Sequence, residues 1–434
     1  MKRALAAAAL TATLVTASGA ALAASPAAAV AFAGASRAAS SGSAATLPLV
    51  SLQRASLDRG TLSLASLDHA SLDRGAPSFA SLDRAAHSLA SLERAYFSDR
   101  PTRLGQAVAD DRATRARVGA FRADASYRTL GAANQPDWMR SVADGASLAA
   151  LSIPGTHDTL AIHGGGLTQT QEDFGDGGGT LARQLSAGIR MIDIRARVNG
   201  GNTLTIHHGA VYQNADFSDV VRVLSDFLAA HPAETVIVRL KQECTGELGS
   251  CTDAPGQKSF QDIFDSYVTP VWWRPSVTRS SAAATPTLGQ VRGKVVLAVL
   301  QSAHGSPIEH YGLAQFASWT DGSSTYIQDD YNVPNIGAIA TKRDRVRRFL
   351  DATNAGDPSK IYVNFGSGAS LFAQPQQVAG GAFGVQGVDP FLLTYLNEGH
   401  GLTRTGVLML DFPGSGLIEK VLSYDEVFRL SVEP

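Results

Sequence analysis

The sequence predicts an α/β fold, a distorted TIM-like (β/α)8 barrel over residues 136–434 that follows a low-complexity N-terminal region. Eight short, apolar, β-branched runs occur after residue 137, and amphipathic helical patterns separate several of them. Some of the segments that connect the predicted strands and helices are irregular, notably 301–324, so we expect a distorted barrel. A doubly wound sheet is the alternative, but it needs a glycine-rich phosphate turn after its first strand, and Gly155-Thr-His-Asp158 is not one.

The first 135 residues divide into two expected segments. Residues 1–24 begin with Met1-Lys-Arg, continue with an apolar alanine-rich stretch and end in small residues, the order of a secretory signal peptide. Residues 25–135 repeat leucine in steps of five or ten, as in the Ala-Ser-Leu-Asp-Arg units around Leu57 and Leu72. A period of five follows no face of an α-helix, and about two coils of a pentapeptide β-helix are too few to stack. We therefore expect a flexible spacer.

Composition limits the partners of the chain. A net charge of −2 over 434 residues gives no reason to expect nucleic acid. No apolar run after the signal peptide is long enough to span a bilayer, so an exported protein is expected. The two cysteines, Cys244 and Cys251, flank a glycine-containing loop, which in an exported protein favours a disulfide over two free thiols.

The predicted elements follow one another along the second part of the chain. Strands are predicted at 149–153, 189–194, 203–207, 235–241, 294–300, 325–329, 361–365 and 406–411. Helical patterns lie between several of them, for example Phe217 to Ala230, Ile336 to Ala352 and Leu417 to Leu430. In a parallel barrel, side chains at the carboxyl ends of the strands converge on one site.

Charged residues and histidines stand at these strand ends. His157 and Asp158 follow the first predicted strand, after Pro154 and Gly155 turn the chain. Asp193 and Arg195 alternate with isoleucines, so both side chains face the same side of their strand. They form either a structural ion pair or a guanidinium that Asp193 holds toward a phosphate. Two histidines, a carboxylate and an arginine suit acid–base cleavage of a phosphodiester.

Alternation along a strand leaves the placement of two pairs of residues undecided. His207 and His208 end the third predicted strand on opposite faces, so only one of them is expected to reach the site. Arg239 and Lys241 share a face at the end of the next strand, where either could be a buried contact or lie at the rim.

These segments resemble the bacterial phosphatidylinositol-specific phospholipases C over roughly residues 137–434. The resemblance lies in Ser152-Ile-Pro-Gly-Thr-His-Asp158, in Ile192-Asp-Ile-Arg-Ala-Arg197 and in Ile206-His-His-Gly209. It implies a distorted TIM-like barrel and a metal-independent reaction without a cofactor, because a calcium-using branch of the family has a carboxylate where Arg195 stands. The substrate implied is phosphatidylinositol at a membrane surface.

The resemblance also implies a role for each matching residue. His157 would be the general base that activates the inositol 2-hydroxyl, with Asp411 as its carboxylate partner. His208 would be the general acid for the diacylglycerol oxygen, oriented by Asp158. Arg195 would stabilise the charged phosphorus centre. The substrate-binding positions would be Lys241, Asp329, Tyr331 and Asp193.

The chain departs from the family pattern in three places. Leu300 aligns with a family arginine that contacts inositol, which weakens the expectation for this headgroup. The loop after the first strand contains Gly164, Gly165 and Gly166 and no tryptophan. The later rim segment, 370–377, is also poor in aromatic residues, so only weak peripheral membrane contact is expected. The Trp272-Trp273 pair is either an interfacial anchor or core packing.

Three functions therefore compete. The leading one is a secreted, monomeric phosphatidylinositol phospholipase C. The second is a related barrel phosphodiesterase with another substrate, and the third is a non-enzymatic lipid- or glycan-binding scaffold. Metal-dependent glycerophosphodiesterases are disfavoured, since they open with His-Arg-Gly rather than Gly-Thr-His-Asp.

Overall fold

The computed structural model describes residues 123–243, 256–275 and 284–425. The expected signal peptide and most of the expected spacer lie outside these ranges. The expected disulfide between Cys244 and Cys251 also lies outside the described residues.

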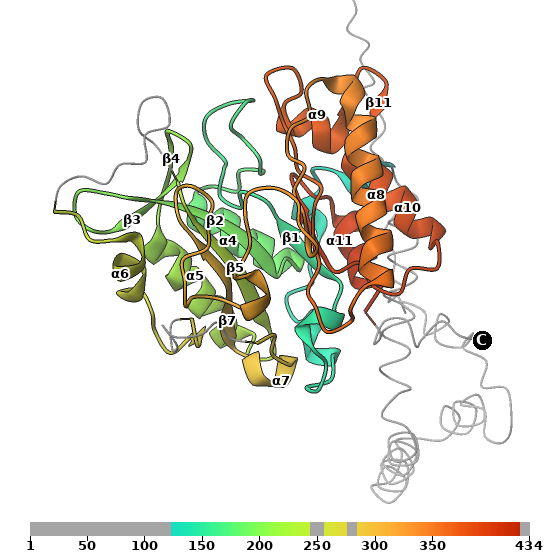
Figure 1. The fold of residues 1–434 in the computed structure, drawn as a ribbon. Coiled ribbons are helices and arrows are strands. Elements are labelled where there is room, and N and C mark those ends of the chain that lie inside the picture. Colours follow the sequence, from blue (N-terminus) through green and yellow to red (C-terminus); the bar gives the residue numbers. More distant parts are fainter. Residues whose placement is uncertain (1–122, 244–255, 276–283, 426–434) are drawn as a thin grey trace, which may run out of the picture. The chain divides into compact units, whose positions relative to one another are not determined.

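A curled sheet of mainly parallel strands forms the centre of the described part (Figure 1). Its strands pair in the order β6-β7-β5-β2-β1-β12-β9-β8. The bounds are β1 (Ile153–Thr156), β2 (Met191–Val198), β5 (Thr235–Gln242), β6 (Trp272–Trp273), β7 (Lys294–Gln301), β8 (Ile327–Gln328), β9 (Val363–Phe365) and β12 (Val407–Leu410). This confirms the predicted α/β, TIM-like class, and the distortion lies in the opening between β6 and β8, which end the pairing order among the described strands.

One predicted strand has a different place. The run at 203–207 forms β3 (Leu204–His208), which is antiparallel to β2 and pairs with β4 (Val211–Asp216) in a hairpin outside the parallel wall. The link 199–203 is too short for the crossover that a parallel neighbour requires. The parallel wall instead includes β6, the Trp272-Trp273 segment, which was not predicted as a strand.

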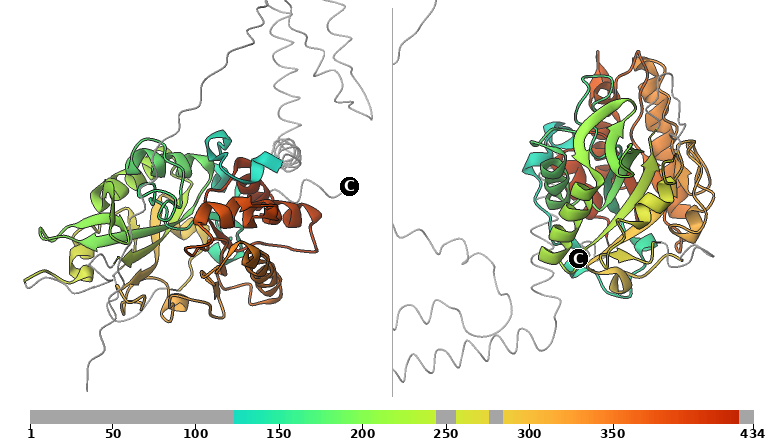
Figure 2. Two further views of the ribbon diagram at one scale, coloured as in Figure 1. Left: turned by 90° about the horizontal axis from the view of Figure 1, so that it is seen from above. Right: turned by 90° about the vertical axis from the view of Figure 1, so that its left-hand side faces the viewer.

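Helices surround the sheet, and three of them gather at one side while the β3–β4 hairpin extends at the opposite side (Figure 2). The helices are α4 (Gly177–Ala187), α5 (Phe217–Ala230), α6 (Phe260–Asp265), α7 (Leu288–Val291), α8 (Ile339–Ala355), α9 (Pro375–Gly380), α10 (Val388–Glu398) and α11 (Ser415–Leu422). The three gathered helices are α8, α10 and α11. A small hairpin, β10 (Gly381–Ala382) and β11 (Val385–Gln386), follows α9.

The predicted helices agree with these elements to different degrees. The helix predicted from Phe217 to Ala230 is confirmed as α5, whose N-terminus carries a capping box made by Asp216 and Asp219. The helix predicted from Ile336 begins as a 3₁₀ turn before α8 continues to Ala355. The last predicted helix corresponds to α11, which ends earlier, at Leu422.

The folded part begins before the expected boundary at residue 136. Leu130 and Ala133 are buried in the hydrophobic core. Tyr127 forms a β-bridge with Pro413, and the amide of Arg128 donates to the carbonyl of Phe412 at 2.9 Å. Residues 123–135 thus pack beside the end of β12 as short 3₁₀ turns and loops.

Close packing explains the glycine in the first strand. A Cβ at Gly155 would lie 2.6 Å from the Met409 sulfur and 2.9 Å from the Met191 carbonyl, so only glycine fits between β12 and β2. Trp272 is buried and packs edge-on against Phe264. Of the two possibilities for this residue, an interfacial anchor or core packing, the structure shows core packing. No helix within 123–243, 256–275 and 284–425 is long and apolar enough to cross a membrane.

Candidate active site

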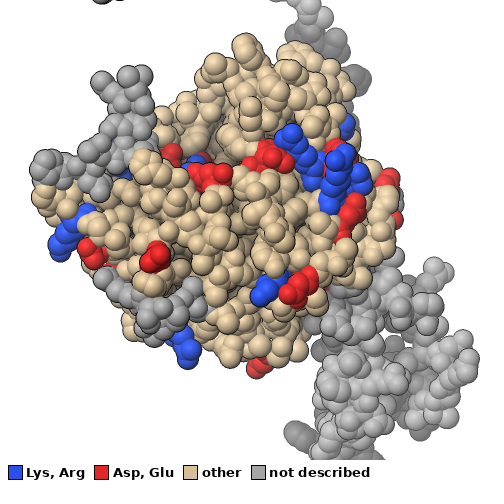
Figure 3. Space-filling view, viewed as in Figure 1, with Lys and Arg blue, Asp and Glu red and all other residues tan. Residues whose placement is uncertain are grey.

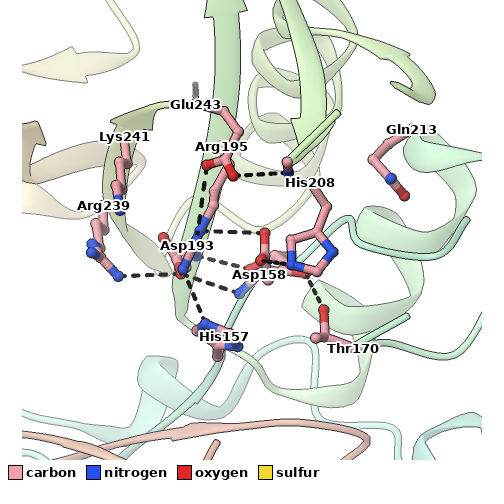
Figure 4. A network of polar contacts seen from close by, with 12 residues as sticks. His157, Asp158, Thr170, Asp193, Arg195, His208, Gln213, Arg239, Lys241 and Glu243 are labelled. Atoms are coloured by element: carbon pink, nitrogen blue, oxygen red, sulfur yellow. Dashed lines mark hydrogen bonds and ion pairs between the residues drawn. The ribbon is translucent and has the colours of Figure 1, made fainter. Parts of the chain in front are cut away.

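The strand ends bring the predicted polar side chains together at one end of the sheet. Figure 4 shows how those from β1, β2, β3 and β5 point toward one another. The residues are His157 and Asp158 after β1, Asp193 and Arg195 within β2, His208 at the end of β3, Arg239 and Lys241 within β5, and Asp411 after β12. Strand-end positions predicted the convergence of His157, Asp158, Asp193 and Arg195, whereas the family resemblance implied Lys241 and Asp411.

His157 is held between a carboxylate and a guanidinium. Its Nδ1 lies 3.0 Å from Oδ1 of Asp411, and its Nε2 lies 3.0 Å from Nη2 of Arg195. Arginine has only donors, so Nε2 must carry the lone pair and Nδ1 the hydrogen. Asp411 therefore accepts from Nδ1, and the basic nitrogen of His157 faces Arg195.

Burial controls the protonation of this pair. Burial, with Arg195 as a further cause, holds the pKa of His157 well below its usual value, so its imidazole is neutral near pH 7 and can accept a proton. Burial and the nearby carboxylates Asp158 and Asp389 raise the pKa of Asp411 well above its usual range. As pH falls, Asp411 therefore loses its acceptor role at a higher pH than an ordinary aspartate.

Arg195 is surrounded by carboxylates. Its guanidinium lies 3.3 Å from Asp193 Oδ2, 3.4 Å from Asp158 Oδ1 and 3.8 Å from Glu243 Oε2. Burial alone would lower the pKa of Arg195, but these negative charges raise it well above its usual value. The cation is therefore permanent, and 14% of its side chain remains exposed.

Asp158 connects this cation to the second histidine. Its Oδ2 lies 3.1 Å from Nε2 of His208. The backbone of Asp158 has φ of 46°, a left-handed conformation that is costly outside glycine and that turns the chain sharply after β1. The other imidazole nitrogen of His208, Nδ1, is buried and has no hydrogen-bond partner among the described residues.

The two adjacent histidines separate as alternation requires. His208 faces Asp158, while the ring of His207 lies 5.5 Å from that of Tyr212 on the hairpin. His208 is therefore the member of the pair that reaches the site, and His207 packs on β4.

Arg239 is a buried support rather than a rim residue. It is 1% exposed, and its Nη1 lies 3.4 Å from Asp193 Oδ2. Its guanidinium also stacks near the rings of Trp319 and Phe365, at 5.2 and 5.7 Å from their centroids. Asp193 thus lies between two guanidinium groups. Although burial opposes it, these cations lower the pKa of Asp193, which stays ionised.

Lys241 has a carboxylate partner that the sequence did not reveal. Its Nζ lies 2.6 Å from Oδ2 of Asp321, whose Oδ1 binds Nη2 of Arg239 at 2.9 Å. Arg239 also donates from Nε to Gln301 Oε1 at 2.6 Å. Leu300 is fully buried in the hydrophobic core, so alternation places Gln301, and not Leu300, on the face of the site.

Asp329 and Tyr331 lie on the segment after β8. The ring centroid of Tyr331 is 5.5 Å from that of His157. Oδ1 of Asp329 is buried and has no hydrogen-bond partner among the described residues. Burial raises the pKa of Asp329, partly offset by Arg239 and Lys342. A buried acceptor without a partner is suited to a ligand hydroxyl.

Two residues of the site were missed from the sequence. Oε1 of Glu243 accepts from the amide of Gly209 at 2.8 Å, which ties the turn after His208 to the end of β5. Glu243 shares the alternation of Arg239 and Lys241 and could have been predicted by extending that pattern by two residues. Asp321 lies on an irregular connection, where no local pattern predicts its contacts.

The arrangement provides a neutral imidazole, a second imidazole, and a permanent cation between them. Within the described ranges, no three His, Cys, Asp or Glu side chains group as metal ligands. These parts can remove a proton, stabilise a phosphorus oxyanion and return a proton to a leaving group.

Comparison with known proteins identifies the family. Residues 151–300 match the model of the phosphatidylinositol-specific phospholipase C, X domain. A 1-phosphatidylinositol phosphodiesterase of Listeria monocytogenes is 33% identical over 299 residues, which are 66% of this chain and 83% of the relative. The chain belongs to the phosphatidylinositol-specific phospholipase C family.

Further similar proteins support the same family assignment. A 1-phosphatidylinositol phosphodiesterase of Staphylococcus aureus is 26% identical over 297 residues, 64% of this chain and 88% of the relative. The solved phospholipase C of Listeria monocytogenes has a TM-score of 0.51 at 30% identity and covers 68% of this chain and 99% of its own. A Staphylococcus aureus enzyme, solved in work on its membrane binding, has a TM-score of 0.52 at 22% identity, covers 67% of this chain and 99% of its own, and so shares the fold.

Proposed function

We propose that this family member is a secreted, metal-independent phospholipase C that converts phosphatidylinositol into diacylglycerol and inositol 1,2-cyclic phosphate. The observation that carries the proposal is the chain of contacts His157–Arg195–Asp158–His208, with distances of 3.0, 3.4 and 3.1 Å. A phosphate bound by Arg195 lies within reach of both imidazoles, one suited to take a proton and one to give it.

The reaction begins at the inositol 2-hydroxyl. Nε2 of His157 takes its proton, while Asp411 holds the tautomer that leaves this nitrogen free. The deprotonated oxygen forms a new bond to the adjacent phosphorus, and the bond from phosphorus to the glycerol oxygen breaks. His208 donates a proton to that oxygen, and Asp158, 3.1 Å from its Nε2, orients the imidazole. The attack is intramolecular, which removes much of the entropic barrier.

Arg195 supplies the electrostatic stabilisation. Its planar guanidinium can pair with two phosphate oxygens and is already oriented by three carboxylates. Because the cation is built into β2, the negative charge that develops at phosphorus needs no bound metal ion.

The inositol ring would bind beside this centre. Asp329 offers a buried acceptor without a protein partner, and Tyr331 lies beside the base histidine. Lys241 comes from the adjacent strand β5 and is held by Asp321. These three residues form the proposed headgroup site. The phosphorus product tests the proposal: a cyclic inositol phosphate is expected first, and a linear phosphate formed first would contradict internal attack.

Exposed apolar side chains on two neighbouring loops support contact with a membrane surface. Leu371 and Phe372, in the loop after β9, are 76% and 75% exposed. The neighbouring loop after β1 carries Leu167, which is 51% exposed, and Gly166 of that loop lies against the side chain of Gln374. Exposed apolar groups on two adjacent loops suit shallow insertion into a bilayer, and the small number of them fits weak peripheral binding.

Replacing Leu371 and Phe372 together by serine is expected to lower binding to phosphatidylinositol-containing vesicles by about tenfold or more, because burying each side chain contributes roughly 1.5–3 kcal/mol. Vesicle sedimentation measures the change. Hydrolysis of monomeric dihexanoyl phosphatidylinositol by the same variant is the control and should be unchanged. Equal losses on both substrates would place the two residues in headgroup binding instead.

The proposal of export is supported by the first residues of the sequence. Lys2 and Arg3, the apolar stretch after them and the small residues near Ala23 support a cleaved secretory signal.

A further inference from the structure

Lys342 is a buried cation that the reaction described above does not use. It lies in the first turn of α8, and its residue is only 2% exposed. Burial of an ammonium group is costly, and a positive charge near a helix N-terminus opposes the helix dipole. Figure 3 shows the other charged side chains of this helix as adjacent basic and acidic groups on the surface, so Lys342 differs from its neighbours.

The ammonium group binds the segment that ends β8. Nζ of Lys342 donates to Oε1 of Gln328 at 3.2 Å and to the backbone carbonyl of Asp330 at 3.0 Å. The same Gln328 oxygen accepts from the amide of Asp330 at 2.9 Å. The Gln328 amide nitrogen donates to Asn364 Oδ1 at 2.8 Å and to the carbonyl of Phe365 at 2.9 Å on β9. A buried network therefore joins α8 to the ends of β8 and β9.

This network fixes which way the turn at residues 328–331 presents its side chains. The carboxylate of Asp330 points outward, 3.6 Å from Nε of Arg345 on the surface of α8. Its neighbours on either side, Asp329 and Tyr331, face inward, where one has a buried oxygen without a partner and the other packs beside His157. Lys342 holds the backbone at the residue between them.

We propose that Lys342 is a positioning residue for headgroup binding: it holds the turn at residues 328–331 so that Asp329 and Tyr331 meet the substrate ring, and it supplies the charge that balances Asp329. This inference rests on the proposed function. It assigns a role in substrate specificity to a side chain that never touches the substrate.

The charge of Lys342 depends on pH. The groups that face it are Asp329 and Asp330 on the turn, Asp411 after β12, and Arg345 on its own helix. Burial lowers the pKa of Lys342 to about 8, and the three carboxylates only partly offset this. The ammonium is thus mostly charged below about pH 8 and mostly neutral above it, so its support for Asp329 is lost as pH rises.

The test measures KM and kcat for monomeric dihexanoyl phosphatidylinositol from about pH 6.5 to about pH 9.5, a range that spans the transition, in the full chain and in two variants. At pH 7, Lys342→Met should raise KM about tenfold, the loss expected for one displaced hydrogen-bonding group, and lower kcat by less than about threefold. The KM of the native enzyme should rise through pH 8 toward the value of this variant. Lys342→Arg keeps a charge that does not titrate, so its KM should stay level.

Matched controls separate positioning from general stability. Arg345→Met removes a cation from the same helix that contacts only the outward carboxylate, and it should leave KM unchanged. Thermal unfolding of each variant reports on stability. If both Lys342 variants fail to fold, the pH profile of the native enzyme decides: a constant KM up to pH 9.5 overturns the positioning role. Failure of the native enzyme to cleave phosphatidylinositol at all overturns the proposed function instead.

Discussion

Replacing His157 by alanine is expected to lower kcat on phosphatidylinositol by about 10⁴-fold, the upper range for loss of a general base. The neutral imidazole between Asp411 and Arg195 is the group that the mechanism uses to accept the 2-hydroxyl proton. His208→Ala should have a similar effect, because the leaving diacylglycerol oxygen would then depart without a proton. Release of diacylglycerol, followed at a fixed lipid concentration, measures both losses.

The matched control is His400→Ala, which removes an imidazole that stacks on Tyr395 at 4.1 Å, outside the site. Its activity should equal that of the native enzyme. Asp411→Asn keeps the imidazole and weakens only its orientation, so it should retain more activity than His157→Ala. A folded His157→Ala enzyme with native turnover would show that another group is the base.

Arg195→Met should lower kcat/KM by about 10³-fold, because it removes the cation that contacts both His157 and Asp158. The methionine preserves the apolar stem of arginine but cannot pair with phosphate oxygens. Arg195→Lys keeps the charge and loses the planar fork, so an intermediate loss is expected. Steady-state kinetics on dihexanoyl phosphatidylinositol compare the three enzymes.

Stability needs its own control in this series. Arg195→Met leaves the carboxylates of Asp158, Asp193 and Glu243 without their shared cation, which also destabilises the folded state. Thermal unfolding and near-ultraviolet circular dichroism identify a folded sample before kinetics are measured. A folded Arg195→Met enzyme within tenfold of native kcat/KM would remove Arg195 from the reaction.

The fold class could be predicted because strand runs and helical patterns are local properties of the chain. The place of each strand in the sheet depends also on the lengths of the connections between elements. The run at 203–207 resembles the other strands, but the short link before it makes β3 antiparallel to β2. The tryptophans at 272 and 273 gave no strand pattern, because two residues are too few to show alternation.

Much of the site could be predicted for the same reason. Polar residues at strand ends such as His157 and Arg195 are visible in the sequence, and parallel strands bring their ends together. Asp321 and Lys342 could not be predicted, since the first lies on an irregular loop and the second in a helical pattern that indicates only an exposed basic face. The expected loss of an inositol contact at Leu300 came from its alignment with a family arginine. The register of β7 places Gln301, and not Leu300, on the side of the site.

The most direct test of internal attack without a metal is phosphorus NMR of phosphatidylinositol micelles incubated with the enzyme in excess EDTA. The predicted first product is inositol 1,2-cyclic phosphate, and phosphatidylinositol with a methylated 2-hydroxyl should remain intact. A linear inositol phosphate as the first product, cleavage of the methylated lipid, or turnover only after calcium is restored would contradict the mechanism built on His157, Arg195 and His208.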